Sequence, residues 1–125
     1  MKFRLNTSKR TAEIFDALYQ REYLQPYALA KIAIALSIKE GFVIENQSQV
    51  SDSNGLELNR QTITGENDSL FKALIEMQEK KHLSDEEYFP DYVKKYIDNG
   101  AILLEQEYKY NNDIYIHLVN LEKGI

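Results

Sequence analysis

Polar and apolar side chains alternate at the start of the chain. Lys2, Arg4 and Asn6 fall on one face of an extended segment, and Phe3 and Leu5 fall on the other. The alternation predicts a short strand that holds two apolar side chains against the core and three polar side chains in solvent.

Two helices are predicted directly after this strand. Thr7 or Ser8 is a suitable N-cap for the first helix, which is expected to end near Tyr23. The residue before Pro26 is pushed out of the α region, whereas proline is well tolerated at the first helical position, so the second helix is expected over residues 26–40. The apolar stripe of the first helix consists of Ala12, Ile14, Phe15, Leu18 and Tyr19.

The second predicted helix, PYALAKIAIALSIKE, is apolar on nearly every side. A helix of this kind is either buried in the core or shared with another subunit. In so short a chain, we favour a contribution to an oligomer interface.

The middle of the chain predicts a loop, a weak strand and a third helix. Residues 45–54 are polar and are expected to form an exposed loop, and residues 55–65 have weak strand character. The third helix is expected over residues 68–81, with a buried apolar stripe.

A fourth helix is predicted from the Ser-x-x-Glu capping box of Ser84 and Glu87. Pro90 falls in its first two turns, and Asn99-Gly100 is expected to end it, although the next seven residues could continue as helix. The sequence EYKYNNDIYIHLV near the C-terminus resembles a small hairpin. Short apolar runs do not separate strand from helix, so residues 108–125 stay open between the two.

Composition and length indicate one mainly α domain over residues 1–125, in which a short N-terminal strand precedes the helices. The chain is 43% hydrophobic and 28% charged, close to globular averages. No window approaches the roughly 18 apolar residues of a membrane span, so a cytoplasmic protein is expected. Because there are no cysteines, any sulfur or cluster chemistry would belong to a partner.

Charge is distributed unevenly along the chain, whose formal net charge is −5. Residues 1–43 hold seven Lys or Arg and four Asp or Glu, whereas residues 44–125 hold eight and sixteen. We therefore expect the two regions to face different partners.

The order strand, helix, helix is that of a ribbon-helix-helix unit, whose paired strands lie in the major groove of DNA. In such a unit Lys2, Arg4 and Asn6 would face bases or phosphates, and Lys9 and Arg10 would reach flanking phosphates. The alternative is that a basic strand packs on its own domain and leaves its charges in water.

Enzymatic interpretations of the sequence are weaker. Asp68 and Glu79-Lys80-Lys81 have the letters of a nuclease site, but one helix would separate them by about 17 Å, too far for a shared ion. The acids after Ser84 are explained by helix capping. The two histidines have no metal-ligand spacing, and the glycines form no phosphate-binding loop. We expect no catalytic residue, metal or cofactor in this chain.

Tyr88, Tyr92 and Tyr96 recur every four residues and would line one edge of the fourth helix. Stacking on single-stranded bases is conceivable there. Acidic neighbours would repel a phosphate backbone, so core packing or a protein interface is the preferred interpretation.

Four segments together resemble the DndE family of DNA sulfur-modification proteins. They are FRLNTSKRTAEIFDAL, ALAKIAIALSI, NGLELNRQTITGEND and VKKYIDNGAILLEQ, in matching order over about residues 3–107. The resemblance implies a small accessory protein of DNA phosphorothioation, associated with nicked duplex DNA and with assembly into a homotetramer. It also implies three partners that perform the sulfur chemistry: a cysteine desulfurase, an iron–sulfur protein and an ATPase.

The resemblance gives the basic N-terminal region a reason to contact DNA. From charge, we assign this role to Lys2, Arg4, Lys9 and Arg10, with Asn6 on the same strand face. Weaker candidates from the same positive region are Arg21, Lys31 and Lys39. A DNA-nicking enzyme of the same pathway and a pure protein scaffold are the alternatives.

Overall fold

The structure is a computed structural model that describes residues 2–47 and 51–111. It is mainly helical with a short N-terminal strand, as expected from the sequence, and this strand belongs to one small antiparallel sheet. The elements in chain order are β1 (Arg4–Asn6), α1 (Lys9–Glu22), α2 (Pro26–Lys39), η1 (Ile44–Asn46), β2 (Glu57–Asn59), α3 (Arg60–Ile63), η2 (Gly65–Asn67), α4 (Asp68–Glu79), η3 (Glu87–Tyr92) and α5 (Val93–Asn111). None of the helices in these two stretches is both long and apolar enough to cross a membrane.

The first two helices begin and end as the sequence predicts. The Ser8 hydroxyl accepts a hydrogen bond from the backbone N–H of Thr11 and caps α1. The helix ends where Tyr23 adopts a left-handed conformation with φ of 60°. Pro26 then occupies the first turn of α2, after an extended residue.

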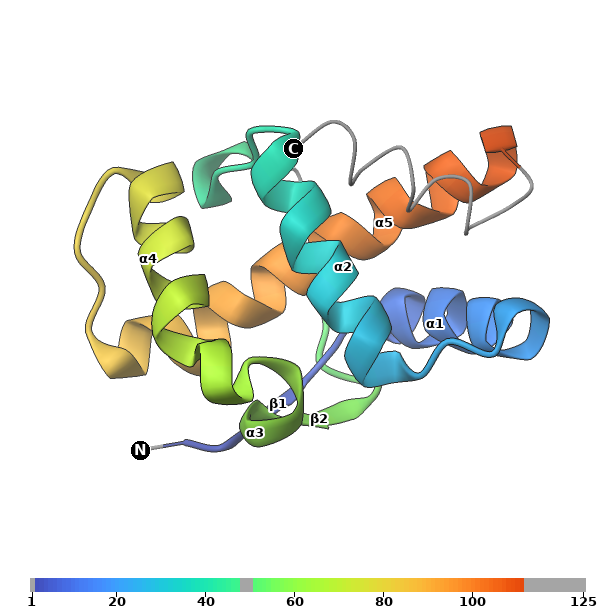
Figure 1. Cartoon of the computed structure of the whole chain (residues 1–125), viewed down its shortest axis with the longest axis horizontal. Coiled ribbons are helices and arrows are strands. Elements are labelled where there is room, and N and C mark those ends of the chain that lie inside the picture. The colour runs from blue at the N-terminus through green and yellow to red at the C-terminus, as the bar shows by residue number, and fades with distance from the viewer. Residues whose placement is uncertain (1, 48–50, 112–125) are drawn as a thin grey trace.

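Helix α2 crosses α5 at the centre of the molecule, and this is the most extensive contact between elements (Figure 1). Its buried face includes Leu29, Ala33 and Ile34, and it also contacts α1, α3 and α4. Burial within the chain therefore accounts for this face of α2, and a contribution of α2 to an oligomer interface stays a prediction.

Gly100 does not end the last helix, contrary to expectation. It lies inside α5 and is fully covered by α2. A Cβ atom at this position would lie 2.6 Å from the Cα of Ala33, and closer still to the Ala33 carbonyl group. Glycine is present here because the two helix backbones approach each other, not because the helix stops.

The predicted capping box forms, but the helix after it is interrupted. The backbone N–H of Ser84 donates to the Glu87 carboxylate over 2.9 Å, and the backbone N–H of Glu87 donates to the Ser84 hydroxyl over 3.1 Å. Phe89 then adopts extended dihedral angles of −126° and 126° before Pro90, and regular helix resumes at Val93.

The sequence left residues 108–125 open between helix and hairpin. Residues 108–111 belong to α5, which runs to Asn111, so the helical alternative is correct for this part. The rest of the possible hairpin, residues 112–125, lies outside the described residues.

Strand β1 pairs with β2 of the same chain, in antiparallel register with Leu5 opposite Leu58. The chain thus supplies both strands of its own ribbon, rather than one strand for a ribbon shared between subunits. Leu5 and Leu58 are buried, but Phe3 is 60% exposed, so its predicted core position is wrong. The backbone N–H of Arg60 donates to the Phe3 carbonyl over 2.7 Å, and the Arg60 guanidinium lies 5.0 Å from the centre of the buried Phe89 ring.

Candidate nucleic-acid interface

An open groove runs beside the N-terminal strand. Lys2, Arg4 and Asn6, the three polar residues predicted for one strand face, all line it and are all exposed. Its volume is about 310 Å³, and its remaining lining residues are Leu5, Ser53, Glu57, Pro90, Asp91 and Lys94. The structure therefore brings these three candidates together.

Acidic side chains balance part of the positive charge in this groove. The Arg4 guanidinium forms an ion pair with Glu57 on β2 at 2.9 Å, and both side chains are more than half exposed. An ion pair of this exposure contributes at most about 1 kcal/mol, so a phosphate group can compete for the guanidinium. Asp91 adds a further negative charge to the groove wall.

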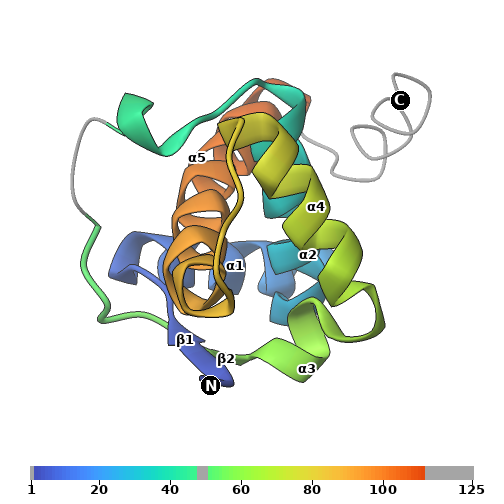
Figure 2. The ribbon, with the colours of Figure 1, turned by 90° about the vertical axis from the view of Figure 1, so that its left-hand side faces the viewer.

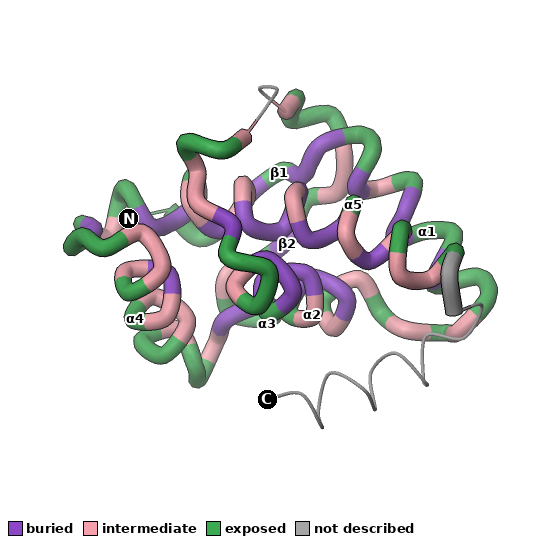
Figure 3. Tube along the Cα trace, turned by 90° about the horizontal axis from the view of Figure 1, so that it is seen from above, coloured by how far each residue is buried: buried purple, intermediate pink, exposed green. Residues whose placement is uncertain are grey.

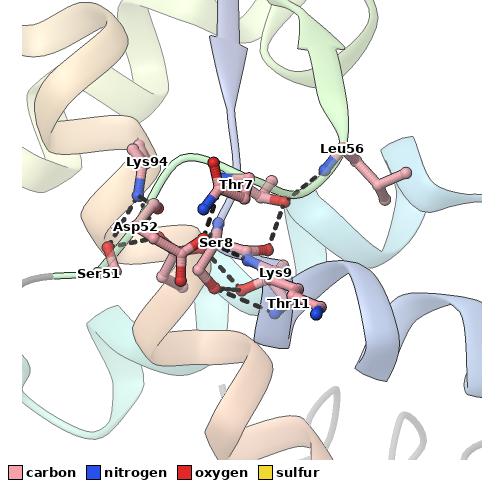
Figure 4. A network of polar contacts seen from close by, with 10 residues as sticks. Thr7, Ser8, Lys9, Thr11, Ser51, Asp52, Leu56 and Lys94 are labelled. Carbon is pink, nitrogen blue, oxygen red and sulfur yellow. Dashed lines mark hydrogen bonds and ion pairs between the residues drawn. The ribbon is translucent and has the colours of Figure 1, made fainter.

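Lys94 lines the groove, but its ammonium group binds other groups of the protein. Its ammonium group lies 2.7 Å from the Asp98 carboxylate and 2.8 Å from the Ser51 hydroxyl, and it also donates to the carbonyl of Asp52 (Figure 4). The side chain is only 14% exposed. Lys94 is therefore a structural cation in the lining of the groove.

Asp98 joins three segments that are distant in the sequence. Its side chain, 4% exposed, accepts hydrogen bonds from the Ser8 N–H at 3.1 Å and the Thr11 hydroxyl at 2.7 Å, in addition to those from Lys94 and Ser51. The network fixes the start of α1 and the loop before β2 against α5. Sequence reasoning missed it, although the i, i+4 spacing of Lys94 and Asp98 within a helix was a usable signal.

Lys9 and Arg10 are exposed at the start of α1, as predicted. The backbone N–H of Lys9 donates to the Asp52 carboxylate over 2.8 Å. Hydrogen bonds from Asn54 and Lys9 lower the pKa of Asp52. The Arg10 guanidinium lies 2.6 Å from Glu105 on α5, so its charge, like that of Arg4, is paired with an acid of the second half.

The three weaker candidates are also exposed but lie away from the groove. Arg21 stacks on the Tyr108 ring at 5.0 Å, and Lys31 lies 5.8 Å from the ring centre of Tyr27. Lys39 is at the C-terminal end of α2, which Figures 1 and 2 show at the opposite end of the molecule from β1 and β2. The eight candidates therefore do not form one continuous basic surface.

The residues that suggested a nuclease have other contacts. Asp68 and Glu79 begin and end α4, as expected, and Asp68 lies 2.7 Å from the Arg60 guanidinium. Glu79 accepts a hydrogen bond from the Tyr96 hydroxyl at 2.7 Å. Within residues 2–47 and 51–111, no three His, Cys, Asp or Glu side chains are grouped to hold a metal ion.

Arg60 joins two acidic residues beneath the end of the sheet. It lies 2.7 Å from both Asp68 and Asp85, and its side chain is 12% exposed. Burial raises the pKa of Asp68, but hydrogen bonds from Arg60 and Thr64 outweigh this effect and hold that pKa below its usual value. The Arg60 hydrogen bond likewise lowers the pKa of Asp85.

The tyrosines of the predicted fourth helix pack in the core. Tyr88 and Tyr96 are completely buried, and Tyr92 is partly buried against the same cluster. Burial raises the pKa of both buried phenols. Core packing was therefore the correct interpretation for this series, and its two buried rings offer no surface for base stacking.

The comparisons with known proteins agree with this fold. The family model described as DNA sulphur modification protein DndE matches residues 4–112. The crystal structure of DndE from Escherichia coli B7A, described as involved in DNA phosphorothioation modification, is similar with a TM-score of 0.65 and 18% sequence identity, over 81% of this chain and 96% of that one. No curated protein matches the chain. The family match covers most of the sequence, and the chain therefore belongs to the DndE family of DNA sulphur modification proteins.

Proposed function

We propose that this chain is a non-catalytic, DNA-binding accessory protein of the phosphorothioate modification system. It contacts duplex or nicked DNA through basic side chains of its N-terminal segment, self-associates, with a homotetramer as the expected form, and assists the catalytic partners. Those partners are the cysteine desulfurase, iron–sulfur protein and ATPase that perform the sulfur chemistry. Membership of the DndE family supports the pathway.

One observation carries the DNA-binding part of the proposal. Lys2, Arg4 and Asn6 line a single open groove, and Lys9 and Arg10 begin the next helix with exposed side chains. Lysine and arginine contact phosphates, and each contact that releases a counterion makes binding weaker in salt. Because Arg4 and Arg10 already have acidic partners, we expect modest affinity and a salt dependence whose slope is set by the few phosphates contacted.

The experiment is a binding titration of intact, nicked and single-stranded DNA across a salt series, with Mg²⁺ present. The Lys2→Gln/Lys9→Gln variant should bind more weakly, and the slope of log K against log salt should fall by about 0.9 for each lost phosphate contact. The matched control is Lys95→Gln/Lys109→Gln, which removes the same charge from α5 and should leave the slope unchanged.

Three outcomes contradict the proposal. Equal binding by the two double variants would show that the N-terminal segment is not the contact. Failure of the parent protein to bind any DNA would favour the scaffold, which the internal pairing of Arg4 and Arg10 with acids also suits. Cleavage that persists through repurification and disappears when one carboxylate is replaced would favour the nicking enzyme.

A further inference from the structure

Helix α4 presents an apolar stripe to solvent. Leu70 is 56% exposed and Met77 is 74% exposed, with Ala73 exposed between them. The spacings of three, four and seven residues place all three on one helix face, which we call the α4 stripe. Only Ile75 of this helix is fully buried, and Figure 3 shows α4 mostly in the colours of exposed and intermediate residues.

Opposite charges flank the two ends of the α4 stripe. Glu66 precedes the helix and is exposed, whereas Lys80 and Lys81 follow its last turn and are also exposed. Glu66 and Lys80 are each seven residues from Ala73. A second copy of α4, turned antiparallel about Ala73, would therefore bring the end that carries Glu66 toward the end of the other copy that carries Lys80.

A hollow beside the stripe has the position that such a pairing requires. It has a volume of about 410 Å³ and is lined by Ala73, Glu76, Met77, Lys80, Lys81 and His82. In the antiparallel arrangement, Leu70 of one copy lies opposite Glu76 of the other, over this hollow. The small side chain of Ala73 at the centre allows the two helix backbones to approach closely.

We propose that α4 docks antiparallel on α4 of a second copy of this chain, with Ala73 at the two-fold axis. The interface is isologous, because Leu70 of each copy enters the hollow of the other and each Glu66 pairs with a Lys80. The inference rests on the self-association proposed above and identifies the surface responsible, which is α4 and not the buried helix α2.

The absence of cysteine from the chain makes a direct test available. Ala73→Cys places one thiol at the proposed axis, where the two copies of the residue would be within disulfide range under mild oxidation. Ala35→Cys, on an exposed position of α2, is the matched control. We expect covalent dimers from Ala73→Cys and no enrichment above collision for Ala35→Cys.

A second measurement tests the contact without cross-linking. Met77→Asp places a charge in the stripe and should raise the dissociation constant in sedimentation equilibrium by at least about tenfold. Glu66→Lys and Lys80→Glu should each weaken association, and combining both changes in one chain should restore it. Far-UV circular dichroism checks that each variant is folded.

Different outcomes would refute the self-association of the chain and the α4 interface. A parent chain that stays monomeric at micromolar concentration, even if its stripe binds another protein, overturns both the self-association and the α4 interface. An oligomer whose mass is unchanged by Met77→Asp, and whose Ala73→Cys variant gives no covalent dimer, overturns the α4 interface alone. If the parent is a tetramer, Met77→Asp should leave dimers, because a closed tetramer of this kind has a second interface.

Discussion

Replacing Gly100 by alanine tests how closely α2 and α5 pack. In an ordinary helix interior this change stabilises a protein by about 1 kcal/mol, because alanine has the higher helix propensity. Here the added Cβ would lie 2.6 Å from the Cα of Ala33 and closer still to the carbonyl carbon and oxygen of that residue. Ordinary contact between carbon atoms requires about 3.5 Å, so the two helices must separate by at least about 1 Å, and the nearer carbonyl atoms require more.

The loss of stability expected for Gly100→Ala follows from the contacts that this separation weakens. A gap of this size removes roughly a quarter to a half of the dispersion energy of each contact across it. The interface is the largest in the fold, and Leu29, Ile34 and Ile97 are completely buried near it. Overpacking destabilises a fold by about 1–3 kcal/mol even where side chains can move aside. Here the obstructing atoms are the backbone of Ala33, which cannot rotate away. We expect a cost of about 3 kcal/mol, which the gain in propensity reduces to about 2 kcal/mol.

Urea and thermal unfolding measure the effect. For a domain of this size, a loss of about 2 kcal/mol lowers the melting temperature by about 8 °C. Ala33→Gly in the same chain should not rescue Gly100→Ala, because the obstructing atoms are backbone. Gln106→Ala, at an exposed position of α5, is the control and should change stability by less than about 0.5 kcal/mol. An unchanged or higher melting temperature for Gly100→Ala would refute the reasoning.

Two further predictions concern the charged networks. Asp98→Asn should destabilise the fold by about 3 kcal/mol in urea unfolding, because Lys94, 14% exposed, loses its carboxylate partner; a change below about 1 kcal/mol would contradict the network. Asp68 and Asp85 have folded-state pKa values below their usual 3.8, so their contribution to stability is present above that pH and is lost as the pH falls through the folded values. The free energy of unfolding should therefore decrease below about pH 5, and the decrease should be shallower in Arg60→Met; an equal decrease would exclude Arg60 as the cause.

Local signals in the sequence predicted the local structure well. Ser8 caps α1, Pro26 begins α2, and Ser84 with Glu87 forms a capping box, because each of these residues acts on backbone groups within a few positions. Gly100 was misread as a helix end because its role depends on Ala33, 67 positions away in the sequence. A glycine required by a tertiary contact and one that ends a helix look alike in the sequence.

The sequence predicted which basic and polar residues line the candidate interface, but not which acidic side chains surround them. Alternation placed Lys2, Arg4 and Asn6 together correctly, because a strand has a fixed side-chain period. It placed Phe3 wrongly: Phe3 is 60% exposed, and Arg60 lies against the buried Phe89 ring. The acids that line this groove, Glu57 and Asp91, come from elsewhere in the chain, and no local pattern specifies such an arrangement.

The charge asymmetry of the sequence is partly cancelled by folding, and this limits how DNA can be bound. Arg4 pairs with Glu57 and Arg10 with Glu105, so two basic side chains of the first half meet acids of the second. Among the described residues, no ion pair reaches Lys2 or Lys9. The N-terminal segment of one chain therefore offers few unpaired cations, and its affinity for a phosphate backbone should be modest. Association of two copies would place two N-terminal segments on one DNA molecule, where the second contact is made at high effective concentration. Disrupting the α4 interface should therefore weaken DNA binding by more than removal of one lysine does.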